Sequence, residues 1–213
     1  MVTAHYIFDP MCGWCYGATA LMETLAAHPD VNLVMHPGGM MTRRPLSDDF
    51  RQHILEADQR IAGLTRQPFG DAYIARVRSG ETIMLDSYLT AQAILAADIA
   101  EQSPFAMLKR IQQGHYVHGF AVAERNVLDG IAADMGIDAK SWQRAMQAAE
   151  TSLMAEIERT QMLMSQWGLG GGLGGFPSLV LEQDGQFKSV PVSHYYGRQD
   201  DWQALWQSIT ATA

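Results

Sequence analysis

Apolar residues follow two different spacings near the start of the chain. Residues 4–9 alternate into an apolar run that is typical of a buried strand, and Pro10 ends it. From residue 13 to residue 27 the apolar positions recur three and four apart, which predicts a helix. A second apolar run at 31–36 predicts another short strand before the turn at Pro37. The chain therefore begins with a strand, a helix and a strand.

The central part of the chain, residues 45–167, has helical spacing and no strand-like alternation. Breaks at glycine and proline divide it into five to seven predicted helices. One of these helices has a clear start, because Ser103 is a good N-cap residue and Pro104 suits the first helical position. We therefore expect a large helical insertion.

Strand character returns after the insertion, and a helix closes the chain. Two runs, 177–181 and 186–192, flank the tight turn Asp184-Gly185 and predict an antiparallel hairpin. From about residue 199 the spacing is helical again, with apolar residues at Trp202, Leu205, Trp206 and Ile209.

The element order predicts an α/β fold with a discontinuous main domain. It reads strand, helix, strand, then helices, then strand, strand, helix. We expect residues 1–44 and 168–213 to form the main domain, and residues 45–167 to form an inserted helical domain.

Length and charge narrow the classes of function. The 213 residues are 47% hydrophobic, which is enough for a sizeable core. A net charge of -8 disfavours nucleic acid and anionic membranes as main partners. No apolar run approaches the roughly eighteen residues of a membrane span, and no secretory signal precedes the first strand. We therefore expect a cytoplasmic protein.

Cys12 and Cys15 are the only cysteines in the chain, and they lie at the start of the first predicted helix. Thiols at this spacing can close into a disulfide and reopen with little movement of the backbone. A structural disulfide gains little from so short a loop. The spacing therefore favours a redox function for the pair.

The position of each cysteine suggests its role. Cys12 lies at the helix start, where the helix dipole favours a thiolate, so it is the expected attacking thiol. Cys15 lies one turn further along, where it is more shielded and suited to resolve a mixed disulfide. Asp9 and Glu23 are nearby carboxylates that could accept the Cys15 proton through water. Asp9 could equally cap the turn before the helix.

A zinc site is an alternative for the cysteine pair, with His115 and His118 as the other two ligands. About a hundred residues separate the two halves, however, whereas compact zinc sites use far shorter spacers. We therefore expect no metal, and we expect both histidines at a solvent-exposed helix end.

A glycine-rich run, 168–175, precedes the predicted hairpin. It matches a dinucleotide-binding pattern at Gly170, Gly172 and Gly175, but a helix precedes it and a strand follows, which is the wrong context. We expect a flexible hinge instead. Phe176-Pro177 then opens the next strand, where a cis peptide bond is available to proline.

These features together resemble the DsbA family of thioredoxin-fold proteins. The run Asp9-Pro10-Met11-Cys12-Gly13-Trp14-Cys15-Tyr16 is most similar to the FrnE-like cytoplasmic branch, whose motif commonly reads Cys-Pro-Trp-Cys-Tyr. His115-Tyr116-Val117-His118-Gly119, followed by Arg125-Asn126-Val127-Leu128, is similar to a Tyr-Phe-x-x-Gly segment and its following helix in that branch.

The resemblance implies a thioredoxin fold with a large all-helical insertion, and it assigns roles to the site residues. It implies Cys12 as nucleophile and Cys15 as resolving thiol. It also implies Pro177 as a cis-proline beside them and the backbone of Phe176 as the partner of an extended substrate. Gly13 replaces the usual proline and loosens the helix start.

Trp14 differs from the periplasmic DsbA oxidases, which carry a histidine at its position. Without that charge we expect a weaker oxidant. The residues and the resemblance together predict a cytoplasmic thiol–disulfide oxidoreductase that works as a reductase or isomerase on protein or small-molecule disulfides. A cellular thiol would recycle it, no cofactor beyond the dithiol is expected, and glutathione is a candidate co-substrate.

Two other functions stay open. Kappa-class glutathione transferases and 2-hydroxychromene-2-carboxylate isomerases share the superfamily, although they typically have serine at the position of Cys12. A protein of that kind would use the methionines of the insertion to line a pocket for a small hydrophobic substrate. A binding module with an apolar groove around Trp14 and Phe176 is the non-enzymatic alternative.

Overall fold

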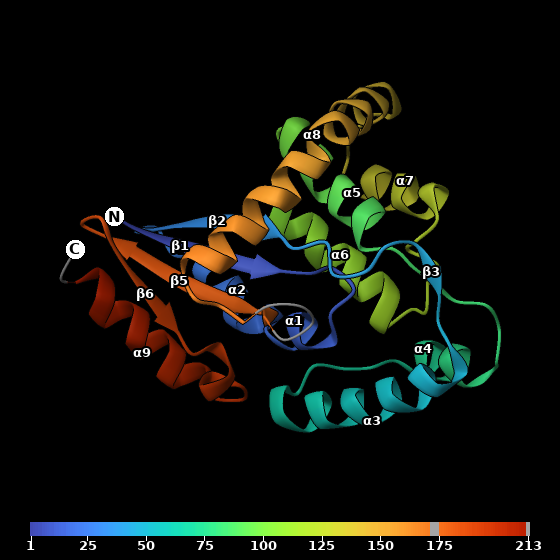
Figure 1. The fold of residues 1–213 in the computed structure, drawn as a ribbon, viewed down its shortest axis with the longest axis horizontal. Helices are drawn as coiled ribbons and strands as arrows, with labels where there is room; N and C mark the ends of the chain where they lie inside the picture. Colours follow the sequence, from blue (N-terminus) through green and yellow to red (C-terminus); the bar gives the residue numbers. More distant parts are fainter. Residues whose placement is uncertain (171–174, 212–213) are drawn as a thin grey trace.

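A four-stranded sheet forms the centre of the fold (Figure 1). The computed structural model describes residues 1–170 and 175–211. The strand order is β2-β1-β5-β6, and β1 pairs with β2 in parallel and with β5 antiparallel. β5 and β6 form the predicted antiparallel hairpin. The strands are β1 (Val2–Phe8), β2 (Val31–Pro37), β5 (Ser178–Gln183) and β6 (Gln186–Val190).

Three helices belong to the segments that supply the sheet strands. They are α1 (Gly13–Gly17), α2 (Thr19–Ala26) and α9 (Gln199–Thr210), and a 3-10 turn (Val192–Tyr195) precedes α9. Trp202 and Trp206 of α9 are fully buried, and the indole N–H of Trp202 donates to the carbonyl oxygen of Leu21 at 2.8 Å. α9 is therefore fixed against α2 by apolar burial and by one buried hydrogen bond.

Six helices occupy the central segment, as the spacing predicts. They lie beyond the end of the sheet, and α8 crosses back to contact β2 (Figure 1). Ser103 caps α6 by accepting from the N–H of Ala106, and Pro104 begins that helix, which confirms the predicted start. The helices are α3 (Asp48–Thr65), α4 (Asp71–Arg78), α5 (Ser87–Ile99), α6 (Pro104–Tyr116), α7 (Arg125–Asp134) and α8 (Ala139–Gln166).

Two local features differ from the sequence prediction. The helix predicted over 13–27 is divided at Ala18, whose N–H donates to the carbonyls of Trp14 and Cys15 and so ends α1 in a tight turn. A small two-stranded sheet, β3 (Arg44–Pro45) with β4 (Met84–Leu85), lies where no strand is predicted. Strands of two residues are too short to produce an alternating pattern.

Both ends of the chain contribute strands to the same sheet, with the helical segment between them. The division into a main domain and an inserted domain stays a prediction. In the described part of the chain, no helix is both long enough and apolar enough to cross a membrane.

Candidate active site

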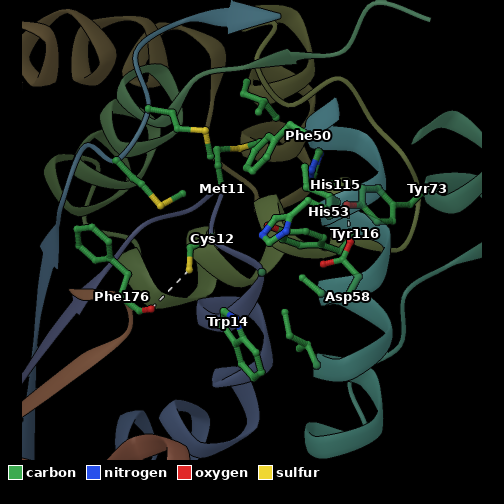
Figure 2. A pocket seen from close by; sticks show the side chains of 17 residues that line it. Met11, Cys12, Trp14, Phe50, His53, Asp58, Tyr73, His115, Tyr116 and Phe176 are labelled. Carbon is green, nitrogen blue, oxygen red and sulfur yellow. Dashed lines mark hydrogen bonds between the residues drawn. The ribbon is translucent and has the colours of Figure 1, made fainter. Parts of the chain in front are cut away.

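Cys12 and Cys15 lie at the junction between the end of β1 and the start of α1. Cys12 is the N-cap residue of α1, and its side chain is 7% exposed, whereas Cys15 has no exposed surface. Both are free thiols. The Sγ of Cys12 points to the carbonyl oxygen of Phe176, 3.9 Å away (Figure 2). Cys15 is therefore more shielded than Cys12, as its position one turn further along predicts.

The Cys15 thiol lies in surroundings that disfavour its charged form. Burial raises its pKa well above the ordinary value, and the hydrogen bond and the charge of Cys12 raise it further. The backbone N–H of Asp9 donates to the Cys15 sulfur at 3.4 Å and opposes this shift. Cys15 is therefore protonated at neutral pH.

Asp9 serves as a structural carboxylate. Its side chain is fully buried and accepts hydrogen bonds from the N–H groups of Met11 and Met40, at 2.9 and 2.7 Å, and from the hydroxyl of Ser87 at 2.7 Å. These three donors favour the turn-capping interpretation. Glu23 does not line the cavity beside Cys12, and it pairs with Lys109 at the surface.

Phe176 and Pro177 lie beside the cysteine pair, although more than 160 residues separate them in the chain. The peptide bond between them is cis. The ring of Phe176 rests against the end of β2, where a Cβ added at Gly38 would stand 2.1 Å from two of its ring carbons. The structure thus brings the predicted site residues together, while the role of each stays a prediction.

A cavity of about 270 Å³ opens beside Cys12 (Figure 2). Most of its lining is apolar, including Met11 and the ring of Phe176. Helices α3, α4 and α6 contribute its polar side chains, which are His53, Asp58, Tyr73, His115 and Tyr116. Such an apolar site with a few converging polar groups is typical of a small-molecule pocket.

His115 corrects one prediction from the sequence. The sequence predicts it at a solvent-exposed helix end together with His118, but it is 6% exposed and lines the cavity. It faces inward because the last turn of α6 packs its ring against Tyr73 and Tyr116. Burial lowers the pKa of His115 to about 4, and the charge of Arg76 adds to this effect.

His118 is exposed, as predicted, and its ring lies against Phe120. Among the described residues, no group of three or more histidine, cysteine or acidic side chains is placed to hold a metal ion.

The methionines of the cavity bear on the alternative of a small hydrophobic substrate. Those that line it are Met11, Met40 and Met41, which precede the helical segment. None of the methionines of residues 45–167 is among its lining residues, although that alternative would have them line a pocket. Met107 and Met146 are instead buried in the core, and Met154 and Met162 are exposed.

Trp14 separates this cavity from a second one of about 420 Å³. Its ring stacks on Tyr196 with 5.7 Å between the ring centroids, and the Tyr196 hydroxyl donates to the Trp14 carbonyl at 3.1 Å. Phe176 also lines both cavities, whereas Pro177 and Ser193 line only the second. Of the three residues predicted to contact substrate, Trp14 and Phe176 are thus shared by both cavities.

Asp58 and Tyr73 are site residues that the sequence reasoning missed. Asp58 is 6% exposed, and its Oδ2 accepts a hydrogen bond from the Tyr73 hydroxyl at 2.7 Å. One signal was present, because Asp58 lies four residues after Ile54 and three before Ile61, on the apolar face of its helix. A carboxylate on such a face is unusual unless it is paired or functional.

The expected glycine hinge lies partly outside the described residues. Positions 171–174, including Gly172 of the dinucleotide-like pattern, are not described. Trp167 and Gly168 end α8 with ordinary backbone hydrogen bonds.

Solved structures are similar to this chain, whereas no family model and no curated protein matches it. Among solved structures, the chain is similar to the cytosolic disulfide reductase DsbM from Pseudomonas aeruginosa, with 36% identity, a TM-score of 0.91, and coverage of 99% of this chain and 100% of that one. A structure of DsbM with GSH matches at 35% identity and a TM-score of 0.86, covering 97% of this chain and 98% of that one.

Two more distant structures support the fold alone. A candidate protein disulfide isomerase from Nitrosomonas europaea is 24% identical over 97% of this chain and 96% of its own, with a TM-score of 0.76. A 2-hydroxychromene-2-carboxylate isomerase is 12% identical over 99% of each chain, with a TM-score of 0.62. The predicted thioredoxin-like fold with a helical insertion is confirmed, while membership of the FrnE-like branch stays a prediction. The chain belongs to the DsbA-like family of thioredoxin-fold thiol–disulfide oxidoreductases.

Proposed function

We propose that this enzyme is a disulfide reductase that works through Cys12-Gly13-Trp14-Cys15 and is recycled by glutathione. The arrangement of its two thiols carries the proposal. Cys12 reaches the wall of a cavity, and Cys15 lies behind it with no exposed surface. A substrate disulfide in the cavity can therefore meet Cys12 and cannot meet Cys15.

The reaction follows from this order of exposure. The Cys12 thiolate attacks one sulfur of the substrate disulfide, and the other sulfur leaves as a thiolate that takes up a proton. Cys15 then attacks the Cys12 sulfur, releases the second substrate thiol, and closes the enzyme disulfide. Two molecules of glutathione reduce that disulfide and leave as oxidised glutathione, so two electrons pass from glutathione to the substrate.

Similarity to solved structures supports the direction of electron transfer and the choice of glutathione as the reductant. A protein with 36% identity over the whole chain is a cytosolic disulfide reductase, and that protein has been solved with GSH. A cytosolic glutathione pool is poised between about -220 and -320 mV depending on the method, which drives most dithiols toward the reduced form. We therefore assign the reductase direction and a cytosolic location.

Trp14, Phe176 and Pro177 are proposed to bind the substrate. Phe176 directs its backbone carbonyl at Cys12, so an extended substrate can pair with the backbone at this point. The Trp14 ring, which lines both cavities, offers an apolar surface next to the reacting sulfur.

The test uses the fact that the chain has only two cysteines. Cys12→Ser is expected to abolish insulin reduction by glutathione. Cys15→Ser is expected to form a stable mixed disulfide with glutathione, which mass spectrometry detects as a single adduct on Cys12. If Cys12→Ser reduced insulin at the wild-type rate, the proposal would be wrong.

A second candidate function is a glutathione-dependent transferase or isomerase. The apolar cavity beside Cys12 favours it, because a small hydrophobic molecule would fit there next to the reactive sulfur. This function needs one thiol, whereas disulfide reduction by the proposed cycle needs two. Activity on a small substrate that survives Cys15→Ala and is lost in Cys12→Ser would favour this alternative.

A further inference from the structure

Asp58 is a buried carboxylate that opens onto the cavity beside Cys12. Its Oδ2 is occupied by the Tyr73 hydroxyl, whereas its Oδ1 accepts no hydrogen bond from any described residue. Oδ1 lies 3.1 Å from the place where a Cβ at Gly13 would stand, next to Cys12 in the chain. Figure 2 shows the Asp58 side chain reaching from α3 into the cavity, with Tyr73 close to its carboxylate.

The surroundings of Asp58 contain few groups that would hold its charge. No lysine or arginine is among the described residues that line the cavity. Asp58 also lines a smaller cavity of about 200 Å³, where Arg78 of α4 is the one cationic side chain among the described lining residues. The other titratable groups that line the main cavity are His53 of α3, Tyr73 of α4, His115 and Tyr116 of α6, and Cys12.

These surroundings keep the carboxyl group close to half protonated at neutral pH. Burial raises the pKa of Asp58 to about 7, and the hydrogen bond from Tyr73 opposes this shift. The neighbouring imidazole of His115 is neutral there, because burial lowers its pKa to about 4. A group with a pKa near the working pH can both accept and return a proton.

Asp9, the other buried carboxylate near the cysteines, is less suited to move a proton. It already accepts three hydrogen bonds, from two backbone N–H groups and from Ser87. Asp58 accepts one and has an unoccupied oxygen on the cavity side. The two carboxylates therefore have different tasks: Asp9 holds the loop, and Asp58 is available to reacting groups.

We propose that Asp58 is a catalytic residue that takes the proton of the Cys12 thiol and returns it to the leaving sulfur of the substrate, and that Tyr73 is its positioning residue. The inference rests on the proposed function, because it assigns a proton carrier to the same thiol chemistry. Both groups line the same cavity, and the proton passes from Cys12 to Oδ1 through water in that cavity. The thiolate forms a bond to one substrate sulfur as the substrate S–S bond breaks. The departing thiolate then takes the proton from Asp58, so the carboxylate is restored.

The first test measures one chemical step. In a Cys15→Ser background, reduced enzyme is mixed with oxidised glutathione, and the rate of Cys12 glutathionylation is followed from pH 5.5 to pH 9.5. Asp58→Asn keeps the shape of the side chain and can still accept from Tyr73. Since acid–base groups commonly contribute 10²–10⁴-fold, we expect a loss of at least about tenfold at pH 7. The loss should narrow as the pH rises, because hydroxide can then remove a thiol proton in place of the carboxylate.

Asp129→Asn is the matched control. Asp129 also accepts from an aromatic side chain at 2.7 Å, the indole N–H of Trp142, but it lies on α7 and does not line the cavity. This control should leave the rate and its pH profile unchanged. An Asp58→Asn profile that matches the control would overturn the assignment.

A second test addresses Tyr73 and does not depend on the rate. Tyr73→Phe removes the hydrogen bond that lowers the Asp58 pKa, so the midpoint of the carboxyl titration should move to higher pH. Carbon-13 NMR of labelled aspartate, assigned with Asp58→Asn, measures that midpoint. A midpoint near the ordinary value of about 4 in the wild type, or an unmoved midpoint in Tyr73→Phe, contradicts the proposal.

The outcomes separate this inference from the proposed function. Glutathionylation that is normal in Asp58→Asn would leave the reductase function intact and remove Asp58 from it. A Cys15→Ser enzyme that forms no adduct at Cys12 would instead contradict the reductase function, and the proton carrier with it.

Discussion

The ring of Phe176 lies directly against Gly38, and no side chain fits between them. A Cβ at Gly38 would stand 2.1 Å from two ring carbons of Phe176, far inside any real contact. Gly38 itself is fixed to the sheet, because its N–H donates to the carbonyl oxygen of Phe8 at 2.8 Å. This contact sets the position of the Phe176 carbonyl, which lies 3.9 Å from the Cys12 sulfur.

Gly38→Ala is therefore expected to disturb the site more than the fold. The methyl group must displace the Phe176 ring, and overpacking of this kind typically costs about 1–3 kcal/mol of stability. Because the Phe176 carbonyl moves with its ring, we expect kcat/KM for insulin reduction to fall about tenfold, in line with the sensitivity of catalysis to small misplacements. Kinetics together with urea unfolding measure the two effects.

Gly63→Ala provides the control for this prediction. A Cβ at Gly63 meets no atom within 4 Å, and the position lies inside α3. Alanine should leave activity unchanged and add up to about 1 kcal/mol of stability through its helix propensity. If the two alanine variants had the same activity, Phe176 would not depend on Gly38 for its position.

A second close approach joins α1 to α3. A Cβ at Gly17 would lie 2.8 Å from Cγ2 of Ile61 and 3.0 Å from Cγ2 of Thr65. Gly17→Ala should therefore destabilise the protein by about 1–3 kcal/mol. In a double-mutant cycle with Ile61→Ala, which removes the clashing methyl group, the two changes should show a coupling free energy of about 0.5 kcal/mol or more. Additive losses would mean that α1 and α3 adjust independently.

The order of strands and helices along the chain was predictable because it depends on local patterns. The alternation of residues 4–9, the Asp184-Gly185 turn and the Ser103-Pro104 helix start each specify a local structure, and the structure contains all three. Cys12 and Cys15 were equally visible, since they are the only thiols. For these features, neighbours in the chain determine the outcome.

The cavity was not predictable in the same way, because its polar residues come from separate helices. Asp58, Tyr73 and His115 belong to α3, α4 and α6, and only tertiary packing brings them to Cys12. His115 shows the consequence: its position at a helix end suggests solvent exposure, yet neighbouring aromatic rings enclose it. Nothing in the spacing of these residues encodes how α3 approaches α1.

The burial of Cys15 predicts the pH dependence of the resolving step. Burial and the adjacent Cys12 raise the pKa of Cys15, so its thiolate is scarce at neutral pH. Since the thiolate is the nucleophile, the rate at which the Cys12–glutathione mixed disulfide resolves should rise about tenfold per pH unit between pH 6 and pH 8. Stopped-flow release of glutathione from the pre-formed adduct measures this rate. A rate that is flat with pH would show that Cys15 is already ionised.

A histidine pair on the sheet predicts how stability depends on pH. The Nδ1 of His5 lies 3.0 Å from the Nε2 of His36, and the Nε2 of His5 lies 2.9 Å from Glu182, so the contacts span β2, β1 and β5. Burial, together with the charges of His5 and Arg159, lowers the pKa of His36 to about 4. In the folded protein at neutral pH, His36 is therefore in its neutral form.

The direction in which stability changes with pH follows from the pKa of histidine in the unfolded chain. In the unfolded chain a histidine has a pKa of about 6.5, so the unfolded state takes up a proton first as the pH falls. The stability contributed by neutral His36 is complete above about pH 6.5 and is lost progressively toward pH 4, in total on the order of 3 kcal/mol. His115 acts in the same direction, because its pKa is also lowered to about 4.

Asp58 opposes this trend, because a carboxyl group with its pKa raised to about 7 gains stability as the pH falls from 7 to 5. Urea unfolding at pH 7 and pH 5 therefore tests the prediction in an Asp58→Asn background, where the free energy of unfolding should be lower at pH 5. Adding His36→Gln should lower the stability at pH 7, because it changes the contact with His5, but the further loss on going to pH 5 should be about half that of Asp58→Asn alone. The remaining half belongs to His115 and should disappear when His115→Gln is added. A pH 5 loss that is unchanged when both histidines are replaced would show that other groups, and not these two buried imidazoles, cause the acid sensitivity.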